Sequence, residues 1–416
     1  MTSGVSKPLF IYLQRPDTGE WVVAGRYRFD DATKVGYFRY ADSYRDKGLA
    51  WSIDPVNLPF RPGEFSQKDR YGGLHDVLRD AGPDGWGQML IRRLHGLPDG
   101  AAPLRYLLHS GNGDRWGALA IGQSTSPNAQ ALVAPKLSKL PELADELRAI
   151  SANLPAVHPM LRKQLFATPS MGGARPKATI QDGTQCWIVK PGLPTDATDL
   201  ELLEHGTQQW GRAAGMRFAQ TVHHPIAGAR SAVRVLRFDR DGEKRIMAVS
   251  AATLLQAQFP APDTSDAGRA SYPRLAEELR RIGAPAEDCF ELYDRMVFNA
   301  IVGNDDDHPR NHAVIYRHDE RRWRLAPAFD VVPSADDTPT RLFMQVSTGR
   351  YDITRESLLA DHRRFGLLMR SQAESRLAET VARIEAAFAD VRTIFNGEQQ
   401  KLMHARLIKA SALLTS

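Results

Sequence analysis

Apolar and polar residues alternate over short stretches in roughly the first 125 residues of the chain. The clearest stretches are PLFIYLQ (8–14), GEWVVAGRYRFD (19–30) and VGYFRYA (35–41), with many Gly and Pro residues between them. A period of two with such breaks predicts small antiparallel strands. A helical pattern follows at residues 74–96, and the sequence GPDG at 82–85 should divide it into a pair of helices.

A segment rich in Ser, Pro, Ala and Lys, residues 124–141, has the composition of a linker. We therefore expect a β-rich N-terminal domain with a helical pair at 1–130 and a second domain at 131–416. Within the second domain the patterns predict elements of both kinds, and from about residue 250 onwards they are mostly helical. The expected helices include PELADELRAISANL (141–154), DATDLELLEHGTQQWGRAAG (196–215) and ESRLAETVARIEAAFADVRTIF (374–395), and the expected strands include QCWIVKP (185–191) and SAVRVLRFDR (231–240).

Composition places the 416-residue chain among soluble globular proteins with room for two or three domains, since it is 42% hydrophobic and 25% charged. The 54 Lys and Arg residues exceed the 49 Asp and Glu residues by five, an excess that suits an acidic ligand but does not by itself predict nucleic-acid binding. Two cysteines, Cys186 and Cys289, are too few for a disulfide framework. No apolar run is long enough for a membrane helix, so we expect a cytoplasmic protein without a membrane partner.

Three consecutive aspartates, Asp305 to Asp307, interrupt an otherwise apolar stretch, FNAIVGNDDDHPRNHAVIY (298–316). The preceding residues have helical periodicity, and Gly303 is expected to end that helix. Pro309 argues against a helix that would place His308 and His312 on one face, which disfavours a histidine metal site. Crowded carboxylates repel one another unless a cation or hydrogen-bond donors compensate them.

The residues after this acidic loop predict a β-hairpin, with Asn311 at its start and Asp330 just past its end. Antiparallel pairing should bring these two side chains together. Amide and carboxylate oxygens in small number suit Mg²⁺ that carries the phosphates of a nucleotide. A solvated acidic loop remains the alternative explanation for the cluster alone.

Other residues could serve the same nucleotide. Lys190 ends a predicted strand and Glu204 lies on the next predicted helix, an arrangement of the lysine–glutamate type found in kinases. Gly172 and Gly173 could allow backbone N–H groups to approach phosphates closely. Each feature alone is weak, because a strand-end lysine can simply be solvated and a Gly-Gly segment can simply be a turn.

The order of these features along the chain, a glycine-rich loop, a lysine, a glutamate, the acidic loop and an Asp after a hairpin, is that of a protein kinase core. In detail the chain resembles the HipA-like serine/threonine kinases, the toxins of bacterial toxin–antitoxin modules. The segments that carry the resemblance are PSMGGARPKA (169–178), WIVKP (187–191), RFDR (237–240), NDDDHPRN (304–311) and LAPAFDVVP (325–333).

The resemblance implies a role for each matching residue. Asp306 would be the catalytic aspartate, and Asn311 and Asp330 would ligate Mg²⁺. Lys190 would contact the phosphates and Glu204 would brace it. The ATP-binding residues it implies are Ser170, Met171, Gly172, Gly173, Ala174, Lys177, Lys190, Leu236, Phe238, His308, Asn311 and Asp330.

Several details qualify these roles. Ser170 occupies the position of the family's loop serine, the residue that members can phosphorylate on themselves. His308 is expected to anchor the loop and not to act as a base. Asp305 and Asp307 stand where smaller residues are common, so the choice of Asp306 depends on its spacing to His308 and Asn311.

The implied fold class is α+β, a two-lobed protein-kinase-like core with a β-rich N-terminal domain, an N-lobe at about 150–245 and a mostly helical C-lobe at about 246–416. The implied function is an ATP- and Mg²⁺-dependent protein serine/threonine kinase. Its implied partners are a helix-turn-helix antitoxin of the HipB type, DNA only through that antitoxin, and a protein substrate, for which an aminoacyl-tRNA synthetase is one known type. A small-molecule kinase of related fold and a co-repressor that acts with a DNA-binding antitoxin are the alternatives.

Overall fold

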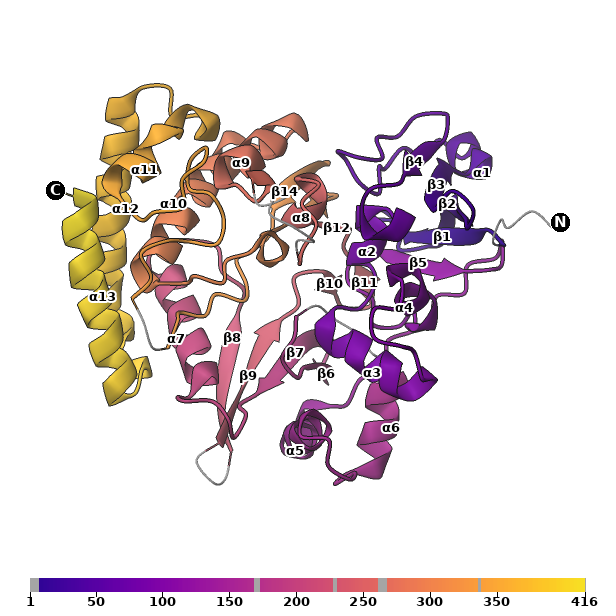
Figure 1. Cartoon of the computed structure of the whole chain (residues 1–416), viewed down its shortest axis with the longest axis horizontal. Coiled ribbons are helices and arrows are strands. Elements are labelled where there is room, and N and C mark those ends of the chain that lie inside the picture. Colours follow the sequence, from indigo (N-terminus) through magenta and orange to yellow (C-terminus); the bar gives the residue numbers. More distant parts are fainter. Residues whose placement is uncertain (1–6, 168–172, 227–229, 261–267, 336–337, 416) are drawn as a thin grey trace. The chain divides into compact units, whose positions relative to one another are not determined.

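The chain forms two compact units in its computed structural model (Figure 1). The model describes every residue except 1–6, 168–172, 227–229, 261–267, 336–337 and 416. Unit 1 contains Met1–Lys190 and Asp239–Val249, and unit 2 contains Pro191–Phe238 and Ser250–Ser416. Because the second stretch of unit 1 interrupts unit 2, neither unit is continuous in sequence.

Unit 1 is built on a five-stranded sheet with the order β4-β3-β2-β1-β5, and the described pairings in it are antiparallel. Large side chains from alternating positions, among them Tyr12, Tyr27 and Phe38, are almost completely buried. Gly36 permits a close approach, because a Cβ atom there would lie 1.8 Å from the carbonyl oxygen of Gly73. The strands are β1 (Leu9–Gln14), β2 (Trp21–Asp30), β3 (Val35–Tyr40), β4 (Phe65–Gln67) and β5 (Leu119–Gly122), which confirms the three predicted first.

Helices and a second hairpin complete unit 1. The predicted pair of helices at 74–96 is confirmed as α2 and α3, and the predicted strand that ends in a lysine is confirmed as β7. Strand β7 pairs with β6 in antiparallel register. The remaining bounds are α1 (Asp42–Asp46), α2 (Asp76–Asp80), α3 (Gly85–His95), α4 (Pro103–His109), α5 (Leu140–Ser151), α6 (Pro159–Ala167), β6 (Ala178–Asp182), β7 (Gln185–Pro191), β10 (Arg240–Asp241) and β11 (Lys244–Arg245); β12 (Ala248–Ser250) spans the boundary to unit 2.

Unit 2 begins with helix α7 (Leu200–Ala213) and the antiparallel hairpin of β8 (Thr221–Ile226) and β9 (Arg230–Leu236). The side chain of Asp199 caps the helix by accepting a hydrogen bond from the backbone N–H of Leu202 (2.9 Å). The hydroxyl of Ser231 on β9 donates to the same carboxylate (2.6 Å). One aspartate therefore fixes the start of α7 against the hairpin.

The rest of unit 2 is mostly helical, as predicted. Helices α10, α12 and α13 contact one another, and α7 packs against α12 (Figure 1). Leu377, Val381, Ile384 and Phe388 on α12 are all buried, which confirms the expected packing face. The remaining elements are α8 (Ala251–Leu254), α9 (Tyr272–Arg281), α10 (Ala286–Val302), β13 (Ala313–Arg317), β14 (Arg322–Leu325), α11 (Arg355–Ala360), α12 (Arg370–Val391) and α13 (Gly397–Thr415).

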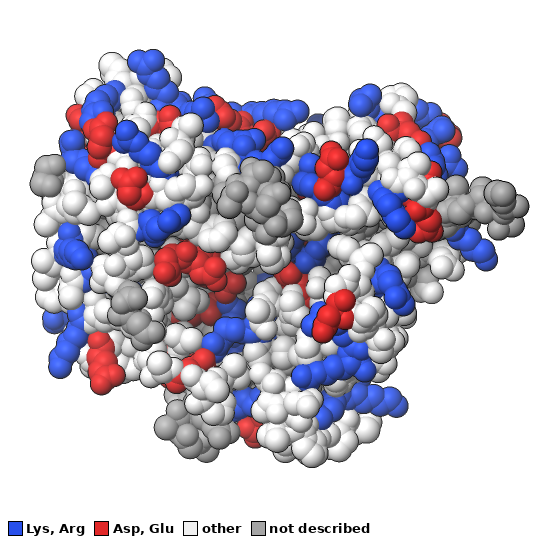
Figure 2. Space-filling model, in the orientation of Figure 1, with Lys and Arg blue, Asp and Glu red and all other residues white. Residues whose placement is uncertain are grey.

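Among the described residues on the face drawn in Figure 2, both signs of charge are present, with Asp and Glu gathered near the centre and Lys and Arg at the lower right. Among the described helices, none combines the length and the apolarity that crossing a membrane requires.

Candidate active site

The acidic loop begins where helix α10 ends. Gly303 takes the left-handed conformation (φ +75°) that terminates a helix, and its N–H donates to the carbonyl of Asn299 (3.0 Å). A Cβ atom on Gly303 would lie 2.9 Å from Pro339, so the close approach also favours glycine. The prediction that Gly303 ends this helix is confirmed.

Asp307, the third aspartate, is turned into the protein and is 1% exposed. Its carboxylate accepts a hydrogen bond from the hydroxyl of Tyr272 and lies 2.9 Å from Nε2 of His312. Asn299 in turn donates to the Tyr272 oxygen (2.9 Å). Asp307 therefore belongs to a buried polar network, and its carboxylate is turned away from solvent.

Asp305 and Asp306 are exposed to solvent. The backbone carbonyl of Asp306 accepts hydrogen bonds from the N–H of His308 (2.9 Å) and from Nδ2 of Asn311 (3.2 Å). Partial burial of its carboxyl raises the pKa of Asp306, the carboxylates of Asp330 and Asp305 raise it further, and His308 opposes the rise. Asp306 is thus the loop aspartate that faces solvent and also lies within the electrostatic reach of Asp330.

His308 anchors the loop through its ring. The ring lies against Phe259 with the centroids 4.0 Å apart and meets Phe343 edge-on at 6.1 Å. Burial lowers the pKa of His308, so the imidazole is neutral near pH 7. The chain is extended at His308 and forms only a short 3₁₀ turn at Pro309–Asn311, so no continuous helix carries His308 and His312.

The predicted hairpin is confirmed as β13 and β14, and the segment beyond it leads to Asp330. This segment is held by backbone hydrogen bonds: Ala328 donates to the carbonyl of Arg217, and Ala219 donates to the carbonyl of Ala328, both at 2.8 Å. Asp330 itself has φ +58°, a left-handed conformation that a residue with a side chain adopts only at a cost.

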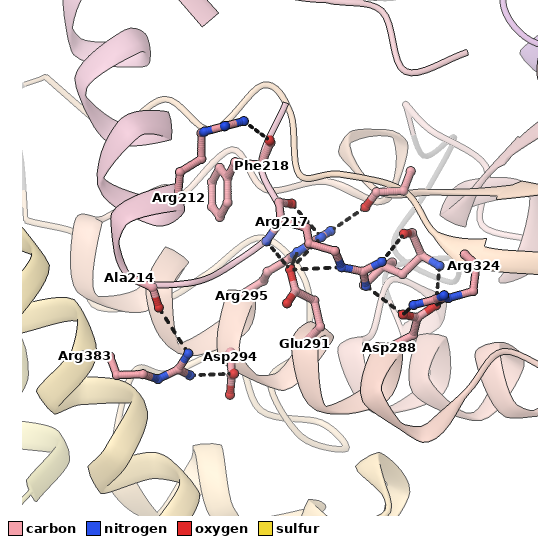
Figure 3. Close-up of polar contacts among 12 residues, drawn as sticks. Arg212, Ala214, Arg217, Phe218, Asp288, Glu291, Asp294, Arg295, Arg324 and Arg383 are labelled. Carbon is pink, nitrogen blue, oxygen red and sulfur yellow. Dashed lines mark hydrogen bonds and ion pairs between the residues drawn. The ribbon is translucent and has the colours of Figure 1, made fainter. Parts of the chain in front are cut away.

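Ion pairs that involve helix α10 also hold the segment before Asp330 (Figure 3). Arg295 on α10 donates to the carbonyls of Ala326 and Arg217, both at 2.8 Å, and pairs with Glu291. Asp288, which is completely buried, accepts from Arg217 and from the backbone N–H of Leu325, both at 2.7 Å. Removal of Glu291 would leave the buried guanidinium of Arg295 without this carboxylate, so the network favours one path of the chain towards Asp330.

Oxygen ligands for a cation are therefore available in unit 2. With Nδ2 of Asn311 engaged by the Asp306 carbonyl, Oδ1 is the atom of that amide that could ligate a metal. The carboxylate of Asp330 is half-buried and acts electrostatically on Asp306. In the part of the chain that the structure describes, no three His, Cys, Asp or Glu side chains form a metal site. Mg²⁺ needs only a few protein ligands when phosphate oxygens complete its coordination.

The other predicted residues of unit 2 lie on α7 and at the end of β9. Glu204 is 3% exposed and accepts a hydrogen bond from Nε2 of Gln208 (3.0 Å). The N–H of Leu236 donates to the carbonyl of Gln220 (2.8 Å). Phe238 packs against Phe329, the neighbour of Asp330, with the ring centroids 5.1 Å apart. Phe238, one of the predicted ATP-binding residues, therefore contacts the segment that carries Asp330.

The remaining predicted residues belong to unit 1. Ser170, Met171 and Gly172 lie outside the described residues. Lys177 and Lys190 are equally buried, each 8% exposed; Lys177 lies in the loop just before β6, as predicted, and Lys190 lies on β7. Lys190 and Glu204 fall in different units, and their pairing stays a prediction.

Gly173, next to the undescribed segment, has φ +89°, and its carbonyl accepts a hydrogen bond from the N–H of Trp86 at the start of α3 (2.9 Å). A Cβ atom on Gly85 would lie 3.3 Å from Cα of Ala174. The first turn of α3 thus holds the end of the glycine-rich segment.

Sequence reasoning missed this contact, the Tyr272–Asp307 network and the role of Arg295. The GPDG turn before α3 was the one local signal, and it indicated a helix start without indicating what that helix contacts.

Comparisons with known proteins show which family and fold the chain resembles. The model of the HipA-like C-terminal domain matches residues 169–388, more than half of the chain. The sequence is 25% identical over 328 residues to "Putative kinase Y4mE" of Sinorhizobium fredii, an alignment that covers 74% of each protein.

The structure is similar to HipA in the complex of Shewanella oneidensis HipA, HipB and operator DNA, with a TM-score of 0.68 and 17% identity over 98% of this chain and 96% of that one. This likeness confirms the predicted α+β, kinase-like fold class. A Helicobacter pylori proinflammatory kinase, CtkA, matches with a TM-score of 0.44 and 13% identity over 57% of this chain and 91% of its own, too distant to add to the argument. The extent of the family match and the order of its motifs show that the chain belongs to the family of proteins with a HipA-like C-terminal domain, and is a HipA-like kinase.

Proposed function

We propose that the chain is an ATP- and Mg²⁺-dependent protein serine/threonine kinase and the toxin of a toxin–antitoxin pair. The catalytic part of the proposal rests on the different environments of two adjacent aspartates in the acidic loop. Asp307 is buried in a hydrogen-bond network, whereas Asp306 faces solvent beside Asn311 and interacts electrostatically with Asp330. This is the distribution that a phosphoryl-transfer site needs, with one carboxylate for the acceptor and separate oxygens for a cation.

Asn311 and Asp330 would hold Mg²⁺, which when bound neutralises charge on the phosphates. Asp306 would orient the acceptor hydroxyl and take up its proton at a carboxylate oxygen, and its raised pKa makes it a stronger base than an ordinary aspartate. Lys190 would contact the phosphates with Glu204 as its brace. Leu236 and Phe238 would border the adenine, and the glycine-rich segment with Lys177 would cover the phosphates. His308 would act by holding the loop.

A cytoplasmic antitoxin of the HipB type is the partner we propose, because the structurally similar Shewanella protein forms a complex with HipB and operator DNA. Contact with DNA would then be indirect, through that antitoxin. The protein substrate, an aminoacyl-tRNA synthetase among the candidates, is not specified by these residues. A small-molecule kinase is the second candidate, and the absence of transfer to any protein would favour it.

The test compares Asp306→Asn with Asp330→Asn. Both variants should lose phosphoryl transfer by about 100-fold or more, but only Asp330→Asn should weaken the binding of Mg·ATP, since Asp306 acts on the acceptor. Calorimetric titration with Mg·ATP and radiolabel transfer measure the two effects separately. Loss of ATP binding in Asp306→Asn with retention in Asp330→Asn would reverse the assignment.

A further inference from the structure

A groove with a volume of about 720 Å³ lies beside the acidic loop in unit 2. Asp305 and Pro309, which bracket Asp306 in sequence, both line it. Its other walls come from the residues near Phe259 and from the segment that contains Pro339 and Phe343. The volume falls within the range of about 300–1,000 Å³ that is usual for ligand sites.

The groove is joined to the catalytic loop by aromatic contacts. The ring of Phe259 stacks on His308 at 4.0 Å and meets Phe343 edge-on at 5.4 Å. His308 is two residues from Asp306, and its N–H donates to the Asp306 carbonyl (2.9 Å). The groove surface and the proposed catalytic aspartate are therefore held in one arrangement.

The wall that carries Phe343 is fixed by the backbone. Leu342 donates to the carbonyl of Tyr351 (3.0 Å), and Gln345 donates to the carbonyl of Ala270 (2.9 Å). Such bracing means that the site is formed before a ligand arrives, which reduces the entropy cost of binding.

Among the described lining residues, two phenylalanines, two prolines, two alanines and Leu342 are apolar, and the polar or charged ones are Gln258, Asp305, Thr338, Thr340, Arg341 and Tyr351. Phe343 remains 38% exposed, and Arg341 lies over the ring of Tyr351 at 5.0 Å on the same lining. An apolar side chain of a polypeptide would bury its surface against Phe259 and Phe343, and the polar groups of the same lining could bond to the polypeptide backbone.

We propose that this groove docks the acceptor polypeptide, and that it selects an apolar side chain within a few residues of the phosphorylated serine or threonine. The inference rests on the proposed function and names the substrate class of that site. Phe343 is its specificity-determining residue, because it is the large exposed apolar side chain on the lining.

The experiment uses a set of synthetic peptides with one central serine, in which each flanking position carries Leu, Ala or Asp in turn. We expect a Leu at one flanking position to raise kcat/KM about tenfold over Ala, the discrimination that an apolar pocket achieves. The Phe343→Ala variant should lose this preference and Phe343→Leu should retain most of it. Leu368→Ala is the matched control, since Leu368 is 70% exposed and is not part of the groove lining.

Two measurements separate failure of the groove from failure of the proposed function. Binding of the fluorescently labelled Leu peptide, followed by anisotropy without nucleotide, should weaken about tenfold in Phe343→Ala, and the affinity for Mg·ATP should be unchanged. If transfer depends on Asp306 but shows no preference for a flanking Leu, the groove proposal alone is overturned. The same holds if the preference exists and Phe343→Ala leaves it intact. If no peptide receives phosphate in a reaction that depends on Asp306, both proposals are overturned.

Discussion

Asp306 and Asp307 are adjacent in the chain, yet a substitution of each should affect a different property. Asp307 is bound to Tyr272 and lies beside His312 within the protein, whereas Asp306 faces solvent. An asparagine at 307 can still accept the hydrogen bond from Tyr272 but no longer carries the charge that faces His312. The consequence should be structural and not catalytic.

We therefore predict that Asp307→Asn lowers the thermal midpoint by several degrees, because a buried charged interaction is lost, and keeps phosphoryl transfer within about tenfold of the wild type. Calorimetry and radiolabel transfer on the same preparations provide the two measurements, with Asp306→Asn as the matched neighbour. A variant as inactive as Asp306→Asn but with an unchanged melting temperature would contradict this assignment.

Spacing to His308 and Asn311 made Asp306 the candidate among the three aspartates, and its catalytic role stays a prediction. The burial of Asp307 could not be predicted, because its partner Tyr272 is 35 residues away and is brought to it only by the packing of α9. Likewise the segment that leads to Asp330 is bonded through Ala328 to residues 217–219, more than a hundred positions earlier. Local pattern identifies which residues are chemically equipped, and tertiary contacts decide which of them face solvent.

Two buried groups in unit 1 make its stability depend on pH in opposite directions. The carboxylate of Asp54 accepts three hydrogen bonds from Val56 and Asn57, yet burial raises its pKa to about 7. Burial lowers the pKa of His75 to about 4. The folded state therefore favours protonated Asp54, and this contribution to the free energy of unfolding is lost as pH rises from about 4 to about 7. The folded state also favours neutral His75, and that contribution is lost as pH falls from about 6.5 to about 4.

In the wild type these contributions offset each other between about pH 4.5 and pH 6.5. We predict that Asp54→Asn exposes the histidine effect, so that the free energy of unfolding rises with pH across this interval by an amount on the order of 2 kcal/mol. Urea denaturation at the two pH values measures it, with the exposed Asp46→Asn as control. A variant with the same pH dependence as the wild type would show that Asp54 does not titrate in this range.

At the scale of elements, the end of α10 was predicted correctly from one local signal, Gly303. The contact of α3 with the glycine-rich segment was not predictable from the sequence. Helical periodicity predicts which face of a helix is apolar, but it does not predict what the first turn of that helix contacts. Trp86 donates its backbone N–H to Gly173, and Gly85 leaves little room beside Ala174. A helix of the N-terminal region thereby holds one end of the proposed phosphate-binding segment.

We predict that Gly85→Val pushes Gly173 and Ala174 away and raises KM for ATP by about three- to tenfold with a smaller effect on kcat, since positioning of the segment and not the chemistry is altered. Steady-state kinetics with varied Mg·ATP measure both constants. Gly397→Val is the control, because a Cβ atom there meets no other atom within 4 Å. Equal changes in the two variants would indicate a general loss of stability.

At the scale of the whole molecule, the two compact units could not be delimited from composition. A linker-like segment marks where the chain changes character, whereas residues 239–249 return to unit 1 from within the sequence of unit 2. The domain boundary at 130/131 stays a prediction, since a domain and a compact unit need not coincide. The family match, by contrast, spans both units, from residue 169 to residue 388.

A whole-molecule question is whether one copy of the enzyme modifies another at Ser170. A phosphate there would add about 1.5 to 2 negative charges to a segment proposed to bind the phosphates of ATP, so repulsion should weaken nucleotide binding and switch the enzyme off. If the segment covers the nucleotide of its own molecule, its serine is poorly placed as the acceptor for that same nucleotide. We therefore predict that Ser170 is modified by a second molecule.

Mixing two complementary variants tests this prediction. Asp306→Asn supplies Ser170 without activity, and Ser170→Ala supplies activity without that serine. Phosphate should appear on Ser170 of the Asp306→Asn chain, as located by mass spectrometry, at a rate proportional to the concentration of the active variant. The doubly substituted Asp306→Asn, Ser170→Ala chain is the control acceptor and should stay unmodified at this position. A rate of Ser170 modification in the wild type that does not change on dilution, with none on the inactive chain, would mean that each molecule modifies itself.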